Sequence, residues 1–422
     1  MNRSILLNGC AIVVVLAMPA FGGDWPQFRG PFFNGSSDEQ GLPSRWSKTE
    51  NVVWVAPLPG PGAATPCVWG DRVFVSSYDK KGNTVLAICL DRLSGAIRWQ
   101  RVVAKAGEVR TSGGTENFMA APSPATDGKR VFFLFGTGDL VSFSMDGVPQ
   151  WQRNLQDEYG EFKIIFGYAA SPLLHEGRLF VPVIHRSDDS YLLAVDPQTG
   201  ETLWRHHRPS DARAESKEAY TTPMPLATKG EWSVLVLGGD CLSAHDPHSG
   251  QERWRWSGLN PRDRGNFRIV TSAVIGAGQV FVTSPQGSPM YALDCSGANP
   301  IKRWMFEKPT SDTPTPVFHD DKLFVLAGKK KVMTCLKPMD GTVHWTQRLD
   351  VNTYLRASPT AGDGKLYCIS ADGEALVLSA GKQPQLLWRT EMGEYPCRSS
   401  IVIAHGQLFI RTGENLYCIG GE

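Results

Sequence analysis

Short stretches in which hydrophobic and polar residues alternate recur from one end of the chain to the other. Residues 177–182 and 191–196 show the pattern well, and Gly, Asp and Pro separate such stretches. Alternation with a period of two, bounded by turn-forming residues, is typical of antiparallel strands joined by tight turns. Long helical patterns are scarce. The sequence therefore predicts an all-β protein built from many short strands.

The alternating stretches belong to a longer repeat of about four strands. Its first half is well represented by residues 171–181, and its second half ends in a tryptophan. Successive copies of that tryptophan are 52, 53, 50, 50, 41 and 43 residues apart, at Trp99, Trp151, Trp204, Trp254, Trp304, Trp345 and Trp388. Four-stranded repeats of this length are the signature of β-propeller blades.

The two ends of the chain predict how the ring closes. Only 34 residues follow Trp388, which is enough for three strands but not for the tryptophan-bearing strand. Residues 51–55 read as a further strand, and its Trp54 precedes Trp99 by 45 residues. Pairing this strand with the last three completes an eighth blade and removes the open sheet edges. We therefore expect one eight-bladed β-propeller over residues 51–422, instead of the three domains that the length suggests.

Each tryptophan closes a fixed pattern of residue types. A small residue is followed by Asp two places on, by Gly four further on and by Trp four further still, as in Ala194, Asp196, Gly200 and Trp204. The small residue leaves room for the indole, whose burial contributes about 3 kcal/mol by area. Departures from the pattern are Lys337 in place of Asp, a shortened turn at 145–147, and a two-residue insertion before Trp304.

This pattern resembles the tryptophan-docking motif of the PQQ-like β-propeller repeat family. Residues 24–31 and 406–420 are similar to the BamB-like exported propeller proteins of planctomycete-type bacteria. The resemblance implies that each indole wedges between adjacent blades, at Trp54, Trp99, Trp151, Trp204, Trp254, Trp304, Trp345 and Trp388. It also implies a non-enzymatic periplasmic scaffold, although shared fold says little about activity.

Composition narrows the classes of partner. The chain has 43 Lys and Arg against 42 Asp and Glu, a net charge near +1, which argues against nucleic acid or an anionic membrane as a charge-driven partner. A hydrophobic fraction of 41% with 20% charged residues excludes a disordered chain and a polytopic membrane protein. No stretch is long enough for a transmembrane span. We expect a monomeric propeller.

The first fifty residues divide into two predicted segments. Arg3, an apolar run at 11–17 and a small-x-small site at 20–22 predict a signal peptide over residues 1–22, and hence export to the periplasm, the cell envelope or the medium. Residues 23–50 form an aromatic arm that carries Trp25, Phe28, Phe32 and Phe33. The arm is either a latch packed on the propeller or an exposed hook for a partner.

The sequence offers little support for catalysis. Eight cysteines follow the leader, and an even count in an exported protein permits disulfides. Cys89, Cys335 and Cys418, however, occupy the small-residue position of the repeat, which favours buried strand residues instead. There are no adjacent cysteines, no haem-attachment motif and no hydrolase motif. His245 and His248 flank Asp246 and could share a metal, but they lie in a hairpin turn that has two sides. We therefore assign no catalytic, cofactor or metal residues.

A binding site is expected in the central funnel, which the first strand of each blade lines. The position two residues before each Ser/Thr-Pro mark faces the axis, and its occupants are Ala63, Ala121, Ala169, Tyr220, Val270, Thr313, Arg356 and Arg398. Arg356 and Arg398 come from neighbouring blades and should converge as an anion or carboxylate site. Tyr168, Tyr220 and Arg268 belong to the same rim. The alternative is a hydrated lining in which these residues pair with Glu218 or Glu394.

Two functional hypotheses follow. The first is a non-catalytic binding or scaffold module of the periplasm or envelope, with a protein, peptide or glycan as partner and no cofactor. The alternative is a PQQ-dependent oxidoreductase with degenerate site residues, which would need PQQ and calcium.

Overall fold

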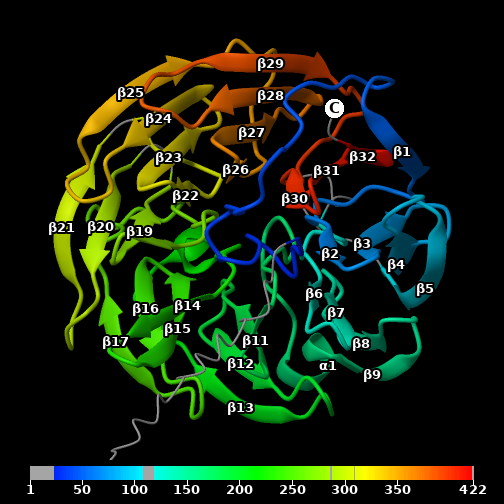
Figure 1. Cartoon of the computed structure of the whole chain (residues 1–422). Helices are drawn as coiled ribbons and strands as arrows, with labels where there is room; N and C mark the ends of the chain where they lie inside the picture. Colours follow the sequence, from blue (N-terminus) through cyan, green and yellow to red (C-terminus); the bar gives the residue numbers. More distant parts are fainter. Residues whose placement is uncertain (1–22, 108–117, 286–287, 308, 421–422) are drawn as a thin grey trace, which may run out of the picture.

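A computed structural model describes residues 23–107, 118–285, 288–307 and 309–420 (Figure 1). The predicted leader at 1–22 lies outside the described residues. Eight four-stranded antiparallel sheets surround a central axis, as the repeat predicted. The helices assigned within the described ranges are α1 (Leu155–Tyr159) and a 3₁₀ turn at Ala214–Lys217, and no helix there is long and apolar enough to cross a membrane.

The strands follow the chain blade by blade, each from the axis outward. Blade 1 has β2 (Cys67–Trp69), β3 (Arg72–Asp79), β4 (Thr84–Asp91) and β5 (Ile97–Lys105). Blade 2 has β6 (Ala125–Thr126), β7 (Arg130–Leu134), β8 (Asp139–Ser144) and β9 (Pro149–Asn154). Blade 3 has β10 (Leu173–His175), β11 (Arg178–Val183), β12 (Tyr191–Val195) and β13 (Thr202–His207). Blade 4 has β14 (Met224–Thr228), β15 (Glu231–Gly238), β16 (Cys241–His245) and β17 (Glu252–Trp256).

The second half of the ring repeats this order. Blade 5 has β18 (Val274–Gly276), β19 (Gln279–Thr283), β20 (Met290–Asp294) and β21 (Ile301–Phe306). Blade 6 has β22 (Val317–His319), β23 (Lys322–Ala327), β24 (Val332–Leu336) and β25 (Val343–Arg348). Blade 7 has β26 (Thr360–Gly362), β27 (Lys365–Ile369), β28 (Glu374–Ser379) and β29 (Leu386–Glu391). Blade 8 has β30 (Val402–Ala404), β31 (Gln407–Arg411), β32 (Asn415–Ile419) and, as its outermost strand, β1 (Val52–Pro57).

The eighth blade closes the ring with strands from both ends of the chain, as predicted. β1 pairs antiparallel with β32, from Val52 opposite Ile419 to Pro57 opposite Asn415. The hydrophobic core lies between blades, where buried side chains of adjacent sheets face each other. Between blades 5 and 6, for example, Val274 and Phe281 join Leu323 and Val325 in one buried cluster. Each blade therefore depends on its neighbours for burial.

The recurring tryptophans lie at these inter-blade contacts. Trp204 stands opposite Ala194 in its own sheet, and its Nε1 donates to the carbonyl oxygen of Pro247 in the next blade at 3.1 Å. Gly250, with φ +75°, lies against the indole, where a Cβ would come within 2.4 Å of the ring. The same indole-to-carbonyl bond is formed by Trp54, Trp99, Trp151, Trp304, Trp345 and Trp388, at 2.7–3.1 Å.

Trp254 is the exception among the described residues, since its indole has no such acceptor. The turn that faces it precedes Trp304 and carries the two-residue insertion, so Gly297 does not lie against the ring. The eight cysteines of the described residues are all buried and free. Asp91, Asp196 and Asp246 each accept two backbone N–H groups of their own turn, as turn-capping residues do.

The N-terminal arm crosses the middle of the ring and packs on one face of the propeller (Figure 1). Trp25 and Trp46 are fully buried, whereas Phe32 is 48% exposed. The arm bonds to blade 1 at Val68, to blade 3 at Leu174 and to blade 7 at Ala361. Arg29 is buried at the centre of this contact and donates to the carbonyl oxygens of Asn34, Pro316 and Pro359. We call this side of the ring the closed face.

The arm also replaces a missing turn. Because β1 precedes β32 in the chain by almost the whole propeller, no hairpin leads from β32 to β1, and the acceptor that other tryptophans find in such a turn is absent for Trp388. The carbonyl oxygen of Trp46 accepts the indole N–H of Trp388 instead, at 2.8 Å. The arm is thus part of the ring closure as well as a cover for the channel.

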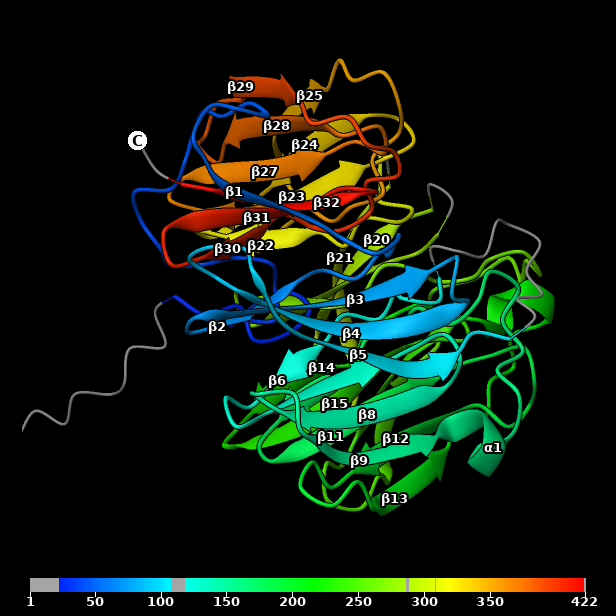
Figure 2. The ribbon, with the colours of Figure 1, turned by 90° about the vertical axis from the view of Figure 1, so that its right-hand side faces the viewer.

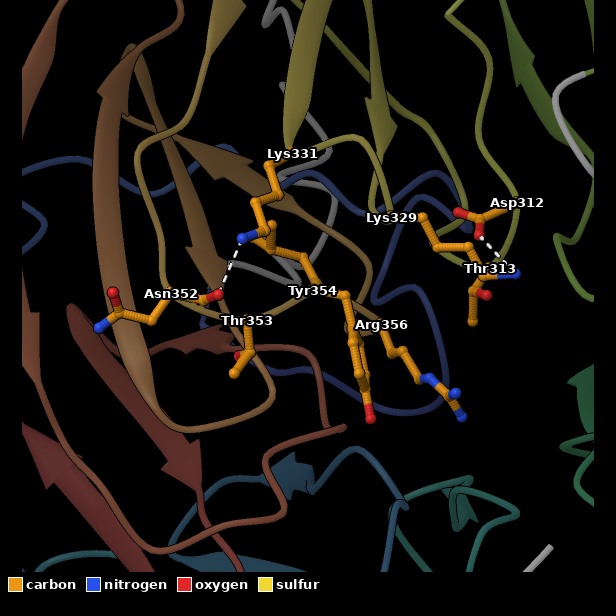
Figure 3. Close-up of a pocket in the computed structure, with 9 residues that line it drawn as sticks. Asp312, Thr313, Lys329, Lys331, Asn352, Thr353, Tyr354 and Arg356 are labelled. Carbon is orange, nitrogen blue, oxygen red and sulfur yellow. Dashed lines mark hydrogen bonds and ion pairs between the residues drawn. The ribbon is translucent and has the colours of Figure 1, made fainter.

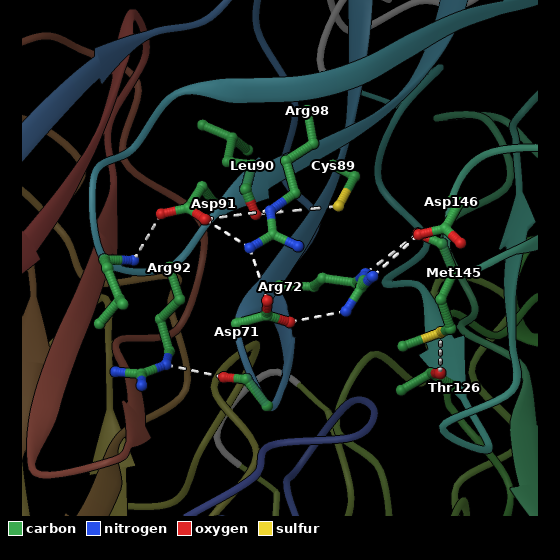
Figure 4. A network of polar contacts seen from close by, with 12 residues as sticks. Asp71, Arg72, Cys89, Leu90, Asp91, Arg92, Arg98, Thr126, Met145 and Asp146 are labelled. Atoms are coloured by element: carbon green, nitrogen blue, oxygen red, sulfur yellow. Dashed lines mark hydrogen bonds and ion pairs between the residues drawn. The ribbon is translucent and has the colours of Figure 1, made fainter.

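Ion pairs between turns add to the closed face (Figure 4). Arg72 of blade 1 contacts Asp146 of blade 2 at 2.8 Å and Asp71 at 2.6 Å. Arg98 bridges Asp71 and Asp91. The opposite side, which we call the open face, carries the longer loops that lead into the first strand of each blade, and α1 lies there in the side view (Figure 2).

Candidate functional site

The open face leads into a central funnel with a volume of about 540 Å³. All eight positions identified two residues before the Ser/Thr-Pro marks line this funnel, namely Ala63, Ala121, Ala169, Tyr220, Val270, Thr313, Arg356 and Arg398. Phe28 of the arm lines it as well. Because the arm packs across the closed face, the channel ends there.

A belt of eight hydroxyl side chains encircles the funnel one level below these positions. Its members are Thr65, Ser123, Ser171, Thr222, Ser272, Thr315, Ser358 and Ser400, one from each blade. Six of the hydroxyl oxygens accept the backbone N–H of the preceding member at 2.9–3.2 Å. The belt thus holds neighbouring first strands together, and none of the six hydroxyls donates to another described residue.

Arg356 and Arg398 both reach the funnel, from the loops before blades 7 and 8. The Arg356 guanidinium lies over the Tyr354 ring at 4.8 Å, and that of Arg398 lies over Phe118 at 5.8 Å. Interaction with Tyr354, and then with the charges of Arg398 and Arg356, holds the pKa of Tyr395 below its usual value. Both guanidiniums and the Tyr395 side chain line the same cavity.

Neither arginine forms an ion pair with a carboxylate of the described chain. Arg356 is exposed, and the Nε of Arg398 is buried without a hydrogen-bond partner within those ranges. Glu218 and Glu394, the acids of the alternative prediction, pair with residues other than these two arginines. Glu394 bonds to Asn415 and Tyr417, and Glu218 is fully buried against Arg186.

Arg268 and Tyr220 also line the funnel, but their polar groups are engaged. Arg268 forms an ion pair with Glu215, and its guanidinium lies over Phe166 at 4.5 Å. Burial, and then the like charge of Arg356, lowers the pKa of Arg268. The Tyr220 hydroxyl donates to Glu218 at 3.2 Å, and burial raises the pKa of both groups.

Tyr168 does not reach the funnel, which corrects its expected place at the rim. The residue is 2% exposed, packs against Phe162 in the core and donates its hydroxyl to the Pro182 carbonyl at 2.8 Å. Neighbouring residues of an extended segment point to opposite sides, so the axis-facing position of Ala169 sends Tyr168 into the core.

Tyr354, Tyr395 and Lys329 also line the funnel, and none of the three was predicted as a site residue. A signal was present, since Tyr354 and Tyr395 precede Arg356 and Arg398 by two and three residues in equivalent loops. A side pocket of about 520 Å³ adjoins the funnel and shares Thr313, Lys329, Tyr354 and Arg356 with it (Figure 3). Its remaining lining is mostly polar, with Asp312, Lys331, Asn352, Thr353 and Leu355.

A second cluster joins blades 3 and 4 and contains His206, His245 and Glu252, whose ligand atoms lie within 4.8 Å of one another. His248, the other candidate, is not part of it. Both His245 nitrogens already bond, to Ser243 and Gly250, and Glu252 is held by Arg255. Burial, and then the charge of Arg208, lowers the pKa of His245 to about 3. The positive charges of Arg208 and Arg255 beside this cluster disfavour a metal cation.

Two curated proteins match parts of the chain. Polyvinylalcohol dehydrogenase of a Pseudomonas species is 26% identical over 215 residues, which are 47% of this chain and 30% of that protein. Outer membrane protein assembly factor BamB of Bordetella pertussis is 23% identical over 268 residues, 59% of each. The chain thus spans less than two thirds of the length of either relative.

Solved structures superpose on the chain as well, and BamB from Moraxella catarrhalis does so with a TM-score of 0.62 over 87% of this chain and 96% of its own, at 15% identity. The quinohemoprotein alcohol dehydrogenase of Comamonas testosteroni superposes with a TM-score of 0.69 over 95% of this chain and 81% of its own, at 12% identity. At that identity the likeness shows the fold alone. A family model described as outer membrane protein assembly factor BamB matches residues 36–181, 161–325 and 301–418. With nearly the whole propeller covered, the chain belongs to this BamB family of PQQ-like repeat proteins.

Proposed function

We propose that this protein is a non-catalytic binding module of the periplasm or cell envelope that holds a protein, peptide or glycan partner through the open face. The funnel is the centre of the binding surface, and Arg356 and Arg398 contact an anionic group of the partner. Membership of the BamB family and the name of the Bordetella relative support an envelope protein as partner. The predicted leader agrees with export.

One observation carries the proposal. Two guanidiniums from adjacent blades reach one cavity and have no carboxylate partner among the residues described there. Structural arginines of this protein are satisfied differently, since buried Arg208 donates to Ser243 and to three backbone carbonyls. An arginine without such acceptors is available for a ligand.

The alternative, a PQQ-dependent oxidoreductase, is favoured by the likeness to polyvinylalcohol dehydrogenase. Calcium takes six to eight oxygen ligands, typically with carboxylates among them. The described funnel lining contains Arg268, Lys329, Arg356 and Arg398 and no acidic residue. A cavity with this charge repels a divalent cation, so the residues present do not fit calcium-held PQQ.

The proposal is tested by recovering the tagged protein from envelope extract after mild crosslinking and identifying its companions by mass spectrometry. We expect envelope proteins to be enriched with the native protein and lost with the Arg356→Ala/Arg398→Ala double variant. Arg262→Ala/Arg348→Ala removes two exposed arginines outside the funnel and serves as the matched control. Equal recovery with both double variants would remove the funnel from the binding surface.

A separate titration with PQQ and calcium addresses the alternative. The proposal expects no quinone spectrum at stoichiometric occupancy and no calcium-dependent reduction of a dye. A stoichiometric, calcium-dependent spectrum with dye reduction would establish the oxidoreductase instead.

A further inference from the structure

The funnel, which we call the cup below, is open on one side only. Phe28 lines it from the closed face, and the arm that carries Phe28 is fixed there by the buried Arg29 and by backbone bonds to blades 1 and 7. A ligand that enters from the open face therefore ends inside the protein. Such a cavity receives the end of a molecule or a substituent, and it excludes a chain that threads through the ring.

The cup carries an excess of positive charge. Four basic residues line it, and no acidic residue does so within the described ranges. Two of the four have a nearby acid, because Arg268 pairs with Glu215 and Lys329 lies 3.8 Å from Asp312. Arg356 and Arg398 have no carboxylate partner in the described part of the chain. Two like charges in one cavity repel each other, and an anionic ligand relieves that repulsion.

The hydroxyl belt below the arginines presents hydrogen-bond donors. Each of its six bonded oxygens already accepts a backbone N–H, so the hydroxyl proton is free to be donated inward. Guanidiniums above and hydroxyl protons below are complementary to an acid group that has several oxygens. A neutral polar group would leave the guanidiniums without a counter-charge.

We infer that the cup binds a doubly charged acid group, a phosphate monoester or a dicarboxylate, that enters end-on from the open face and lies between Arg356 and Arg398. The inference rests on the proposed function and specifies the chemistry of the ligand. The adjoining side pocket, which shares Tyr354 and Arg356 with the cup, gives room for the rest of a larger molecule over blades 6 and 7 (Figure 3).

Calorimetric titration with three small probes at constant ionic strength tests this charge requirement. Inorganic phosphate and malonate represent the two sources of a double charge, and acetate represents a single charge. We expect phosphate or malonate to bind at least about tenfold more tightly than acetate, and Arg356→Ala and Arg398→Ala each to weaken that binding by about tenfold or more. Arg262→Ala should leave it unchanged.

The possible outcomes distinguish failure of the charge requirement from failure of the proposed function. A preference for phosphate alone or malonate alone supports the inference and names the source. Equal affinity for acetate and the double anions, or effects of the arginine variants that do not differ from Arg262→Ala, overturns it. If no probe binds while envelope proteins still require Arg356 and Arg398, the charge requirement is wrong but the binding module stands; if neither depends on these arginines, both fail.

Discussion

The two mouths of the same channel are built from the same eight repeats but use arginine in opposite ways. On the closed face, Arg29 is buried and donates to three carbonyl oxygens, and short turns are joined by docked indoles and ion pairs. On the open face, Arg356 and Arg398 stand on longer loops and have aromatic neighbours but no described carboxylate partner.

The difference teaches how to separate structural from ligand-binding residues in a repeat protein. A buried charge that donates to several backbone carbonyls stabilises the fold, and its removal leaves those carbonyls unpaired. A charge that the fold does not satisfy costs little to remove and is free to bind. Stability measurements on the closed face and binding measurements on the open face should therefore respond to different substitutions.

The largest expected effect on stability comes from Arg29→Ala. Loss of the guanidinium leaves the Pro316 and Pro359 carbonyls without their donor under the arm, and we expect a decrease of about 3 kcal/mol in the free energy of unfolding. Urea denaturation measures it. A decrease below about 1 kcal/mol would mean that the arm contributes little to the closed face.

Acid should weaken the closed face next, through His245 beside the turn at Gly250. Its pKa of about 3 lies below the 6.5 of an unperturbed histidine, so the unfolded chain takes up the proton first and stability falls as the pH drops below about 6.5, down to about pH 3. Between pH 6.5 and about pH 5 the loss is about 2 kcal/mol.

Denaturation of the native protein and of His245→Gln at the two pH values isolates this contribution. The variant removes the titrating group, so its loss of stability over the same interval should be smaller by that amount. Equal losses would show that His206 or the carboxylates dominate the acid response.

A smaller effect distinguishes two tryptophans of the closed face. Trp204→Phe removes a hydrogen bond to Pro247, whereas Trp254→Phe removes an indole without such a bond. We expect Trp204→Phe to cost about 1 kcal/mol more in unfolding free energy, which is the net contribution of one hydrogen bond. Thermal and urea unfolding of both variants measure the difference, and equal costs would assign the docking to ring packing alone.

The smallest expected change in stability is that of Arg356→Ala/Arg398→Ala on the open face. Neither side chain satisfies a buried group, so the free energy of unfolding should stay within about 0.5 kcal/mol of the native protein. A melting curve measures it alongside the binding experiments. A large loss would return both arginines to a structural role and end the contrast between the faces.

The architecture was predictable because the same four-stranded pattern, ending in a tryptophan, recurs at regular spacing along the chain. Blade number, closure by residues 51–55 and the small residue opposite each indole follow from spacing and from period-two alternation. The same register brought Arg356 and Arg398 to the axis. It placed Tyr168 wrongly only because a side chain one residue from an axis-facing position points the other way.

Features outside the repeat could not be derived in this way. The arm has no second copy to compare with, so its path across the closed face and the burial of Trp25 and Trp46 depend on contacts far apart in the sequence. Tyr354 and Tyr395 occupy loops whose shape the strand pattern does not determine. The site therefore combines residues at a fixed position of the repeat, which could be predicted, with loop residues, which could not.

The pairing of β1 with β32 ties the order of folding to the order of synthesis. β1 is synthesised long before β32, and Val52 can pair only when Ile419 is present. Contacts of such high sequence separation form late and slowly. Until then β1 and β32 each have an unpaired edge that can pair with another chain. A protein of this design is consequently most exposed to aggregation just before completion, and a chain cut short at either end never leaves that stage.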